Sequence, residues 1–280
     1  MRRITLAIAA TGAVAALALT GCGSSPAQLG GVELAAAEVV QQSAQKAEAV
    51  TSYTVDAVVD VTGGEQRSGR IQGTMRYQSR PRLAADLTLN TVNFGGRDVP
   101  GGAHVILLED TVYVNVDALN KALGATKPWL KASLSDLDAE DQKQAREMAD
   151  RVRQFDLAGT VQMISTSKDV QAVGTETVGG VETTHYSGTF PVETALAQLD
   201  PDKRDRAREE LAEIENMRFD MWADAQNLPR KITLSGEADE GSFNATMLFT
   251  GFNEPVEINA PPADQVGELP ERTGDAPTGD

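Results

Sequence analysis

The chain has one cysteine and two histidines among its 280 residues. A lone cysteine excludes an intramolecular disulfide, so the folded part must be stabilised by its apolar core. Neither His104 nor His185 belongs to an H-x-x-H, H-x-x-E or H-E-x-x-H motif, so both are predicted to be surface histidines rather than metal ligands. The sequence also lacks a G-x-S-x-G motif for a serine nucleophile. These absences predict that the protein is not an enzyme and that it holds no metal and no cofactor.

The polar clusters that do occur have structural interpretations. Glu109 and Asp110 are predicted to form a hairpin turn. The acids at 138–141 are predicted to begin a helix, where the macrodipole favours negative charge without any catalytic role. The glycine-rich stretch 95–102 (GGRDVPGG) is not followed by a helix that could complete a phosphate cradle. We expect it to form a loop at the rim of a sheet, where it could gate a cavity.

Positive charge is scarce throughout the chain. The sequence has 25 lysines and arginines against 41 aspartates and glutamates, which gives a formal net charge of −16. Such acidity argues against a nucleic-acid partner and against a body that lies flat on anionic lipid. It does not oppose attachment through an acylated tether, because the acyl chains hold the body away from the membrane surface.

The start of the chain has the layout of a secretory signal. Arg2 and Arg3 precede the apolar run 4–19, which is too short for a stable membrane span with its flanks. The closing quartet Leu-Thr-Gly-Cys, 19–22, resembles the bacterial lipobox. The resemblance implies that Cys22 receives a diacylglyceryl group on its sulfur and that the signal is cut before it. An ordinary signal with a chance cysteine is the alternative, and the arginine pair is only a weak twin-arginine signal.

Composition divides the rest of the chain. The start of the exported part is rich in Gly, Ser and Pro, which is typical of a flexible linker. The C-terminal stretch is rich in Pro, Gly and acids, which is typical of disorder. The predicted organisation is a signal peptide at 1–21, a tether at 22–32, one folded domain at 33–259 and a disordered acidic tail at 260–280.

The folded part is predicted to be α+β, with one large curved antiparallel sheet. A helix is expected at 33–50, and period-two alternation then indicates strands with one apolar and one polar face. Further helices are expected at 135–155, 160–165, 192–199 and 201–216, between groups of strands. No alternating strand–helix–strand rhythm of a parallel sheet is present. The simplest arrangement is a half-barrel whose helices pack on its concave face.

The predicted apolar face carries many small or flexible side chains. Close-packed sheet cores normally use larger aliphatic residues, whereas alanine and methionine leave room or adapt to variable shapes. A cavity for an apolar ligand is therefore expected between sheet and helices. The alternative is that the composition is alanine-rich overall and the helices simply sit closer. The residues predicted to line the cavity are Val55, Ala57, Met75, Leu87, Met221, Leu234, Ala245 and Met247.

A hairpin motif near the end of the domain points to a family. Residues 219–234 (FDMWADAQNLPRKITL) resemble the W-x-D…L-P-x-K/R hairpin of the LppX/LprG-type lipoproteins and, more distantly, of the LolA carriers. Asp224 can accept bonds from turn amides, Pro229 suits the start of a strand, and Lys231 is expected opposite an acid on the polar face. The resemblance implies a curved antiparallel sheet around a lipid-accepting cavity. Some members of the family bind acylated glycolipids and move them outward.

The function expected from these features is lipid binding at the outer face of the cell membrane. The protein would be anchored through Cys22 and would hold an acyl chain or lipoglycan tail, which it would carry across the envelope. The alternative is an envelope scaffold or accessory sensor with a solid core that acts through a protein partner, which the sequence does not identify.

Overall fold

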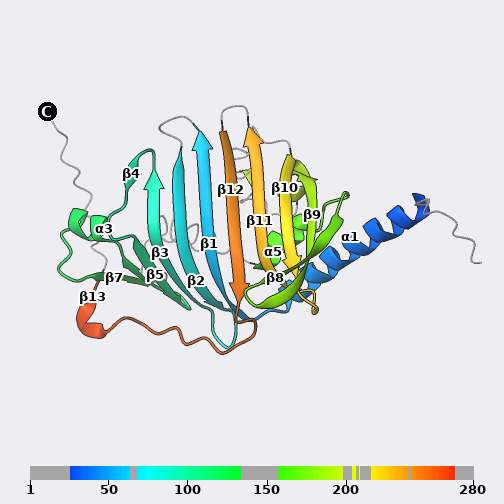
Figure 1. Cartoon of the computed structure of the whole chain (residues 1–280). Helices are drawn as coiled ribbons and strands as arrows, with labels where there is room; N and C mark the ends of the chain where they lie inside the picture. Colours follow the sequence, from blue (N-terminus) through cyan, green and yellow to red (C-terminus); the bar gives the residue numbers. More distant parts are fainter. Residues whose placement is uncertain are drawn as a thin grey trace, which may run out of the picture.

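The computed structural model describes residues 26–63, 68–133, 157–197, 204–205, 208, 216–238 and 241–268. The strands form one broad sheet of thirteen strands. The strands are β1 (Ser52–Gly63), β2 (Gly69–Gln78), β3 (Ala84–Phe94), β4 (Arg97–Asp98), β5 (Ala103–Leu108), β6 (Thr111–Asn115), β7 (Trp129–Ser133), β8 (Gln171–Val178), β9 (Val181–Pro191), β10 (Asn216–Ala223), β11 (Pro229–Ala238), β12 (Gly241–Thr250) and β13 (Val266–Glu268). The helices are α1 (Pro26–Glu48), α3 (Asp117–Ala122), α5 (Leu157–Ile164), α6 (Val192–Leu196) and the 3₁₀ turn η1 (Ala263–Gln265). Figure 1 shows α1 and α5 at the β8 end of this sheet and α3 at the opposite end.

The sheet is open and almost wholly antiparallel. Its strand order is β13-β7-β6-β5-β3-β2-β1-β12-β11-β10-β9-β8, with β4 paired to β3 off this path. Only β13 and β7 run parallel among the described strand pairs. The predicted α+β class with a single large curved sheet is therefore confirmed, with one parallel edge strand added.

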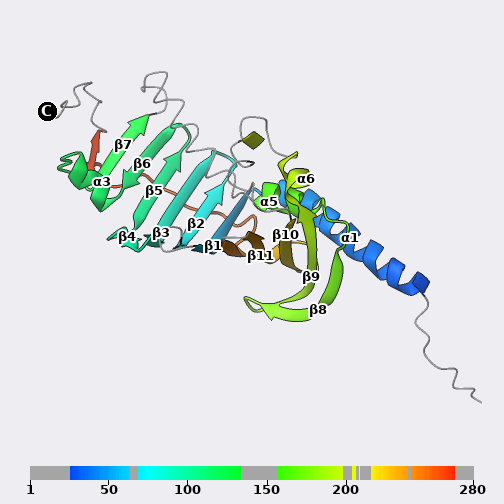
Figure 2. The same cartoon turned by 90° about the horizontal axis from the view of Figure 1, so that it is seen from above.

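The main core lies between the helices and the half of the sheet that runs from β9 to β12, and it continues onto β1 and β2. Seen from above, α1, α5 and α6 lie over that half (Figure 2). Val40 of α1 and Val161 and Ile164 of α5 are fully buried in the same cluster as Phe219 and Phe249 of the sheet. Each such side chain contributes roughly 1.5–3 kcal/mol through its burial, so this half of the sheet is held firmly to the helices.

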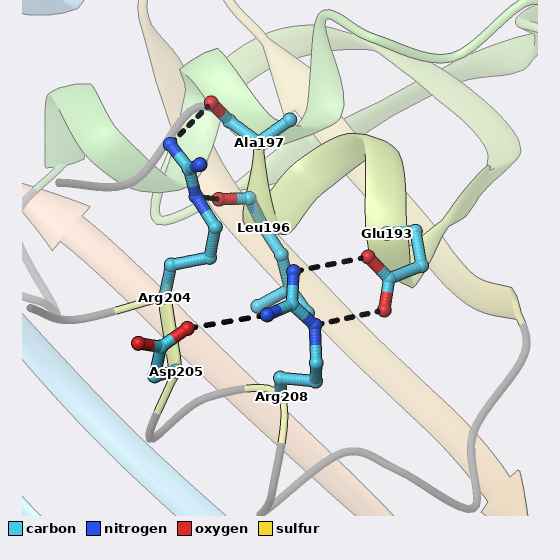
Figure 3. A network of polar contacts seen from close by, with 6 residues as sticks. All are labelled: Glu193, Leu196, Ala197, Arg204, Asp205 and Arg208. Carbon is cyan, nitrogen blue, oxygen red and sulfur yellow. Dashed lines mark hydrogen bonds and ion pairs between the residues drawn. The ribbon is translucent and has the colours of Figure 1, made fainter. Parts of the chain in front are cut away.

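Polar contacts hold α6 in place. The guanidinium of Arg204 donates to the carbonyl oxygens of Leu196 (3.2 Å) and Ala197 (3.3 Å) at the end of the helix. Arg208 donates to both carboxylate oxygens of Glu193, at 3.3 and 3.4 Å (Figure 3). The hydrogen bond and the charge of Glu193 raise the pKa of the Arg208 guanidinium above its usual value. The two arginines thus tie the positions at 204 and 208 to both ends of this short helix.

The N-terminal helix begins earlier than predicted. It runs from Pro26, so residues 26–32 are helical rather than part of a flexible tether. Proline is well suited to the first turn, because the amide hydrogen that it lacks would have no partner there. The predicted helix at 135–155 and most of the one at 201–216 lie outside the described residues.

The predicted disordered tail is wrong for residues 260–268. After β12 the chain crosses the sheet as an irregular strap, 251–262, and then forms η1 and β13. Asn253 N donates to Ser52 O (2.9 Å), and Ile258 is buried against Ala84, Ile106 and Trp129. The order of this segment could not be predicted from a composition rich in Pro and acids, because it depends on backbone partners far along the chain and on the buried side chain of Ile258. Residues 269–280 lie outside the described part.

Candidate functional site

The predicted cavity residues share one face of the sheet. Directly opposed residues of an antiparallel pair point to the same side. The pairs Val55–Met75, Met75–Leu87, Ala57–Met247, Leu234–Ala245 and Val55–Phe249 therefore place their members on the helix-bearing face. All eight predicted residues belong to the main core or pack against it: Val55, Ala57, Met75, Leu87, Met221, Leu234, Ala245 and Met247.

These residues differ in how fully they are covered. Val55, Met75, Met221, Leu234 and Met247 are buried. The core cluster beneath α1 and α5 includes three phenylalanines that are almost completely buried. The remaining three residues are only partly buried. The part of the face with room for a ligand is therefore expected toward β3, away from the helices. That each residue lines a cavity remains a prediction.

The continuation of this face over β3, β5, β6 and β7 is entirely apolar. The register Leu87–Val105–Val114–Leu130 carries it across four strands. We call it the β3–β7 face, and its side chains are Ala85, Leu87, Leu89, Ala103, Val105, Leu107, Val112, Val114, Leu130 and Ala132. Within the described chain, no helix packs extensively against these strands. Seven of the ten side chains are only half-buried.

A face of this kind suits an apolar ligand without strong polar recognition. None of its ten side chains can donate or accept a hydrogen bond. An acyl chain laid on it would gain roughly 25 cal/mol for each Å² of apolar surface removed from water. The whole β5–β7 contribution was missed from the sequence, although the hairpin turn at Glu109 and Asp110 was predicted correctly. The alternation in 103–115, matched in phase to β3, would have identified Val105, Leu107, Val112 and Val114.

A cavity of about 310 Å³ lies elsewhere, beneath the strap. Its wall includes Ala84, Leu108, Val256 and Ile258, with charged side chains such as Arg82 nearby. Ala84 pairs with Leu108 on the face opposite to the helices. None of the eight predicted residues lines this cavity, which is formed by the strap and the sheet end.

Both histidines lie on the outer face, bonded to carboxylates. His104 Nε2 is 2.8 Å from Asp86 Oδ1, and Asp86 also accepts from Arg76. His185 Nε2 is 2.8 Å from Asp220 Oδ1. Both imidazoles are partly covered rather than freely exposed. The described residues contain no group of three or more His, Cys, Asp or Glu that could hold a metal ion.

Each imidazole also contacts a tryptophan. The His185 ring stacks on Trp222 with centroids 4.3 Å apart, whereas His104 meets Trp129 edge-on at 4.7 Å. Trp222 donates its indole N–H to Glu176. These contacts explain both histidines as parts of structural clusters on the outer face.

The predicted hairpin motif is structural. Asp224 accepts from the amides of Gln226 (2.9 Å) and Leu228 (3.0 Å), as expected. It also accepts from Arg230 Nε at 2.7 Å. Lys231 lies on the outer face as expected, but the residue opposite it is Trp222 rather than an acid. Its ammonium lies 3.9 Å from the centroid of the Trp222 ring, where the π face attracts a cation.

The turn also contacts the first helix, because Asn227 donates its side-chain amide to Gln42 of α1 (2.8 Å). The hairpin therefore fixes α1 against the sheet and lies away from the β3–β7 face.

Cys22 and the signal segment lie outside the described residues. Among the residues that are described, no helix combines the length and apolar character needed to cross a bilayer.

Comparison with known proteins gives two sequence relatives. No family model matches the chain. An uncharacterized 31.2 kDa protein from the rplA–rplJ intergenic region of Streptomyces griseus is 30% identical over 176 residues, which cover 61% of this chain and 58% of that relative. The chain thus matches less than two thirds of that protein's length. The candidate lipoprotein SCO4650 of Streptomyces coelicolor is 24% identical over 298 residues, covering 96% of this chain and 95% of that relative.

A solved structure shares the architecture of this chain. LprF from Mycobacterium bovis has a TM-score of 0.50 at 14% identity, covering 81% of this chain and 97% of that one. LppX from Mycobacterium tuberculosis has a TM-score of 0.45 at 18% identity, covering 81% of this chain and 99% of that one. The likeness to LprF shows the fold. The resemblance to LppX/LprG-type lipoproteins expected from the sequence is confirmed at that level.

Proposed function

From a fold shared with LprF, we propose that this protein is an exported, lipid-anchored carrier of an acylated ligand. The acyl chain, alone or as the tail of a lipoglycan, would lie on the β3–β7 face. The observation that carries the proposal is the wholly apolar, half-buried surface of that face, against which no described helix packs extensively. A sheet face in contact with water would instead carry polar side chains.

The envelope location is proposed from the start of the chain. The lipobox-like quartet ending at Cys22 supports attachment to the outer face of the cell membrane. The relative from Streptomyces coelicolor, itself described as a candidate lipoprotein, supports the same assignment. Two or more acyl chains are enough for stable anchoring, whereas a single chain binds only marginally. The anchored body would take up its ligand from the membrane and deliver it outward.

A matched pair of substitutions tests the ligand site. Ala132→Trp places a large ring on the β3–β7 face, whereas Lys131→Trp places the same ring on the opposite side of the same strand. The full chain is purified from a host that makes acylated glycolipids, and bound lipid is extracted and measured by mass spectrometry. We expect the wild type and Lys131→Trp to carry lipid and Ala132→Trp to lose most of it.

Other results would decide against the proposal. Equal lipid content in both variants would show that the ligand does not bind to the β3–β7 face. A lipid-free wild type, with a second protein recovered on it, would favour the scaffold or accessory sensor. The nearly complete burial of the core side chains beneath α1 and α5 is the observation that favours this second function.

A further inference from the structure

The cavity beneath the strap lies apart from the proposed acyl site. Ala84, which forms part of its wall, precedes Ala85 of the β3–β7 face along β3 and so points to the opposite side of the sheet. The volume of about 310 Å³ is at the lower end of the range for small-molecule sites. At roughly 30 Å³ for each water molecule, it has room for about ten non-hydrogen atoms. The cavity is therefore of a size that suits a small metabolite.

Two walls of the cavity come from neighbouring turns of the sheet. The loop between β2 and β3 is closed by Gln78, whose side-chain amide donates to the carbonyl oxygen of Arg82 at 3.2 Å. The turn after β5 is fixed by Glu109, whose backbone amide donates to the carbonyl oxygen of Leu83 at 2.9 Å. All four of these residues line the cavity. Their hydrogen bonds hold the backbone of both walls in place before any ligand binds.

The third wall is the strap, which runs from β12 toward η1 and β13 below the sheet in Figure 1. The hydroxyl of Ser52 donates to the carbonyl oxygen of Glu254 at 2.6 Å, and Arg76 donates to the carbonyl oxygen of Glu257 at 3.5 Å. Ile258 is buried against the sheet. The strap is thus fastened to the sheet at each of these points, and it keeps the cavity in shape.

Charged side chains of both signs lie around the cavity. Arg82, Glu109 and Glu257 belong to its lining. Within the described part of the chain, none of these three charged groups makes an ion pair or a hydrogen bond. Although their charges are opposite, the arginine and the glutamates do not pair with one another. Their charged groups therefore remain available to a ligand that carries both a positive and a negative charge.

Glu109 has a backbone conformation that is unusual for glutamate. Its φ is 56°, in the left-handed region where glycine or asparagine is common and bulkier residues are rare. Tight hairpin turns favour glycine at such positions. Glutamate at this point costs backbone stability relative to glycine, and strain of this kind is concentrated at ligand sites. A use for the carboxylate in the cavity gives a physical reason for it.

The buried part of the lining is apolar. Ala84 and Ile258 are buried, and Leu108 beside them is partly buried. The cavity thus combines an aliphatic floor with one cation and two carboxylates. We propose that it binds an α-amino acid with an aliphatic side chain, in the zwitterionic form. The ammonium lies beside the two glutamates, the guanidinium of Arg82 donates to the carboxylate, and the side chain packs on the floor.

Simpler ligands match this lining less well. A carboxylic acid without an ammonium brings its charge near Glu109 and Glu257 as well as near Arg82, and the two acids repel it. An amine without a carboxylate leaves the guanidinium of Arg82 without a partner and is repelled by it. A zwitterion without an aliphatic side chain leaves the apolar floor in contact with water. Each part of an aliphatic amino acid therefore has a counterpart in the cavity.

Titration calorimetry of the full chain with L-leucine tests the site. Three probes each lack one part of leucine: leucinamide lacks the carboxylate, 4-methylpentanoate lacks the ammonium, and glycine lacks the aliphatic side chain. We expect leucine to bind with a Kd below about 1 mM and each of the three probes to bind at least about tenfold more weakly, because each loses a charged contact or apolar burial.

Two substitutions assign the charged contacts. Arg82→Gln should abolish the preference for leucine over leucinamide, and Glu257→Gln should reduce the preference for leucine over 4-methylpentanoate. Arg80→Gln is the matched control, because Arg80 is exposed and is not among the lining residues. It should bind leucine like the wild type. All three substituted side chains are exposed, so thermal unfolding of the ligand-free variants should match that of the wild type.

Hydrogen exchange locates the bound amino acid. Leucine should slow the exchange of backbone amides in the strap at 256–259 and at 109, since these residues line the cavity. Protection of other segments without these two would place the amino acid elsewhere and overturn the proposal.

Three calorimetric results would also overturn it. The first is no binding of leucine by the wild type at concentrations up to about 10 mM. The second is equal binding of leucine and 4-methylpentanoate, which would make the cavity an anion site. The third is an equal loss in Arg80→Gln and Arg82→Gln. The proposal is independent of the carrier function, so Ala132→Trp, on the opposite face of the sheet, should bind leucine like the wild type even where it loses lipid.

Discussion

The turn between β10 and β11 offers a stability prediction that can be worked out from its contacts. The carboxylate of Asp224 is 1% exposed. It accepts from the amides of Gln226 and Leu228 and from the guanidinium of Arg230. Asp224→Ala would leave two amides without their acceptor and a partly buried guanidinium without its partner. Breaking a buried pair in this way costs about 3–5 kcal/mol, and the 23% exposure of Arg230 places the expected loss near the lower end.

Urea unfolding followed by tryptophan fluorescence measures this loss, since Trp222 lies in the same hairpin. Asp224→Asn keeps one carbonyl oxygen for the two amides and loses the charge, so we expect about half the effect of alanine. A double-mutant cycle with Arg230→Met should give a coupling of about 1–3 kcal/mol. A loss below about 0.5 kcal/mol for Asp224→Ala, the range of ordinary surface substitutions, would refute the role given to this turn.

Three further predictions concern other parts of the fold. Burial raises the pKa of Asp169, but bonds from Thr189 and Ser167 outweigh it, so its pKa is lowered from 3.8. The resulting stability is fully present above 3.8 and is lost as the pH falls through the lowered pKa of the folded state, and Asp169→Asn should flatten this acid limb in urea titrations between about pH 5 and pH 2. Gly188→Ala places a Cβ 2.9 Å from the buried Phe219 ring, so thermal unfolding should show that the free energy of unfolding falls by about 1–2 kcal/mol. An unchanged melting temperature would contradict the tight packing at Gly188. Ile258→Ala should lower the free energy of unfolding by about 2 kcal/mol, measured by calorimetry, and loosen the strap around Trp129. A loss below about 0.5 kcal/mol, the range of ordinary surface substitutions, would show that Ile258 does not anchor the strap.

Local patterns were enough to predict the strands and the face that they share. Alternation placed Val55, Met75 and Leu87 on one side, and the register confirms it. The helix start at Pro26 was missed because a Gly- and Pro-containing segment has the composition of a linker. β13 was missed because three residues carry no measurable period, and its order depends on pairing with β7.

The sequence did not show which half of the apolar face would be filled. That depends on where α1 and α5 pack together, and α1 lies far along the chain from both α5 and β8, which it contacts. Met221 and Ala57 have the same kind of pattern in the sequence, yet one is fully buried under the helices and the other is only partly covered. The burial of Asn120 in α3 was likewise hidden, because its side chain is turned inward by a hydrogen bond to the carbonyl oxygen of Pro128 in the following loop.

The pairing of β1 with β12 sets the order in which the sheet can be completed. Thr54 lies opposite Thr250, so the centre of the sheet joins two stretches from opposite ends of the polypeptide. A chain that leaves the ribosome or a translocation channel amino end first must expose one edge of β1 until residues 241–250 emerge. Such distant pairing slows folding and prolongs the exposure of an aggregation-prone edge. Truncation before β12 would therefore leave two half-sheets with open edges, and assistance from a chaperone is needed most in the interval before the last strand arrives.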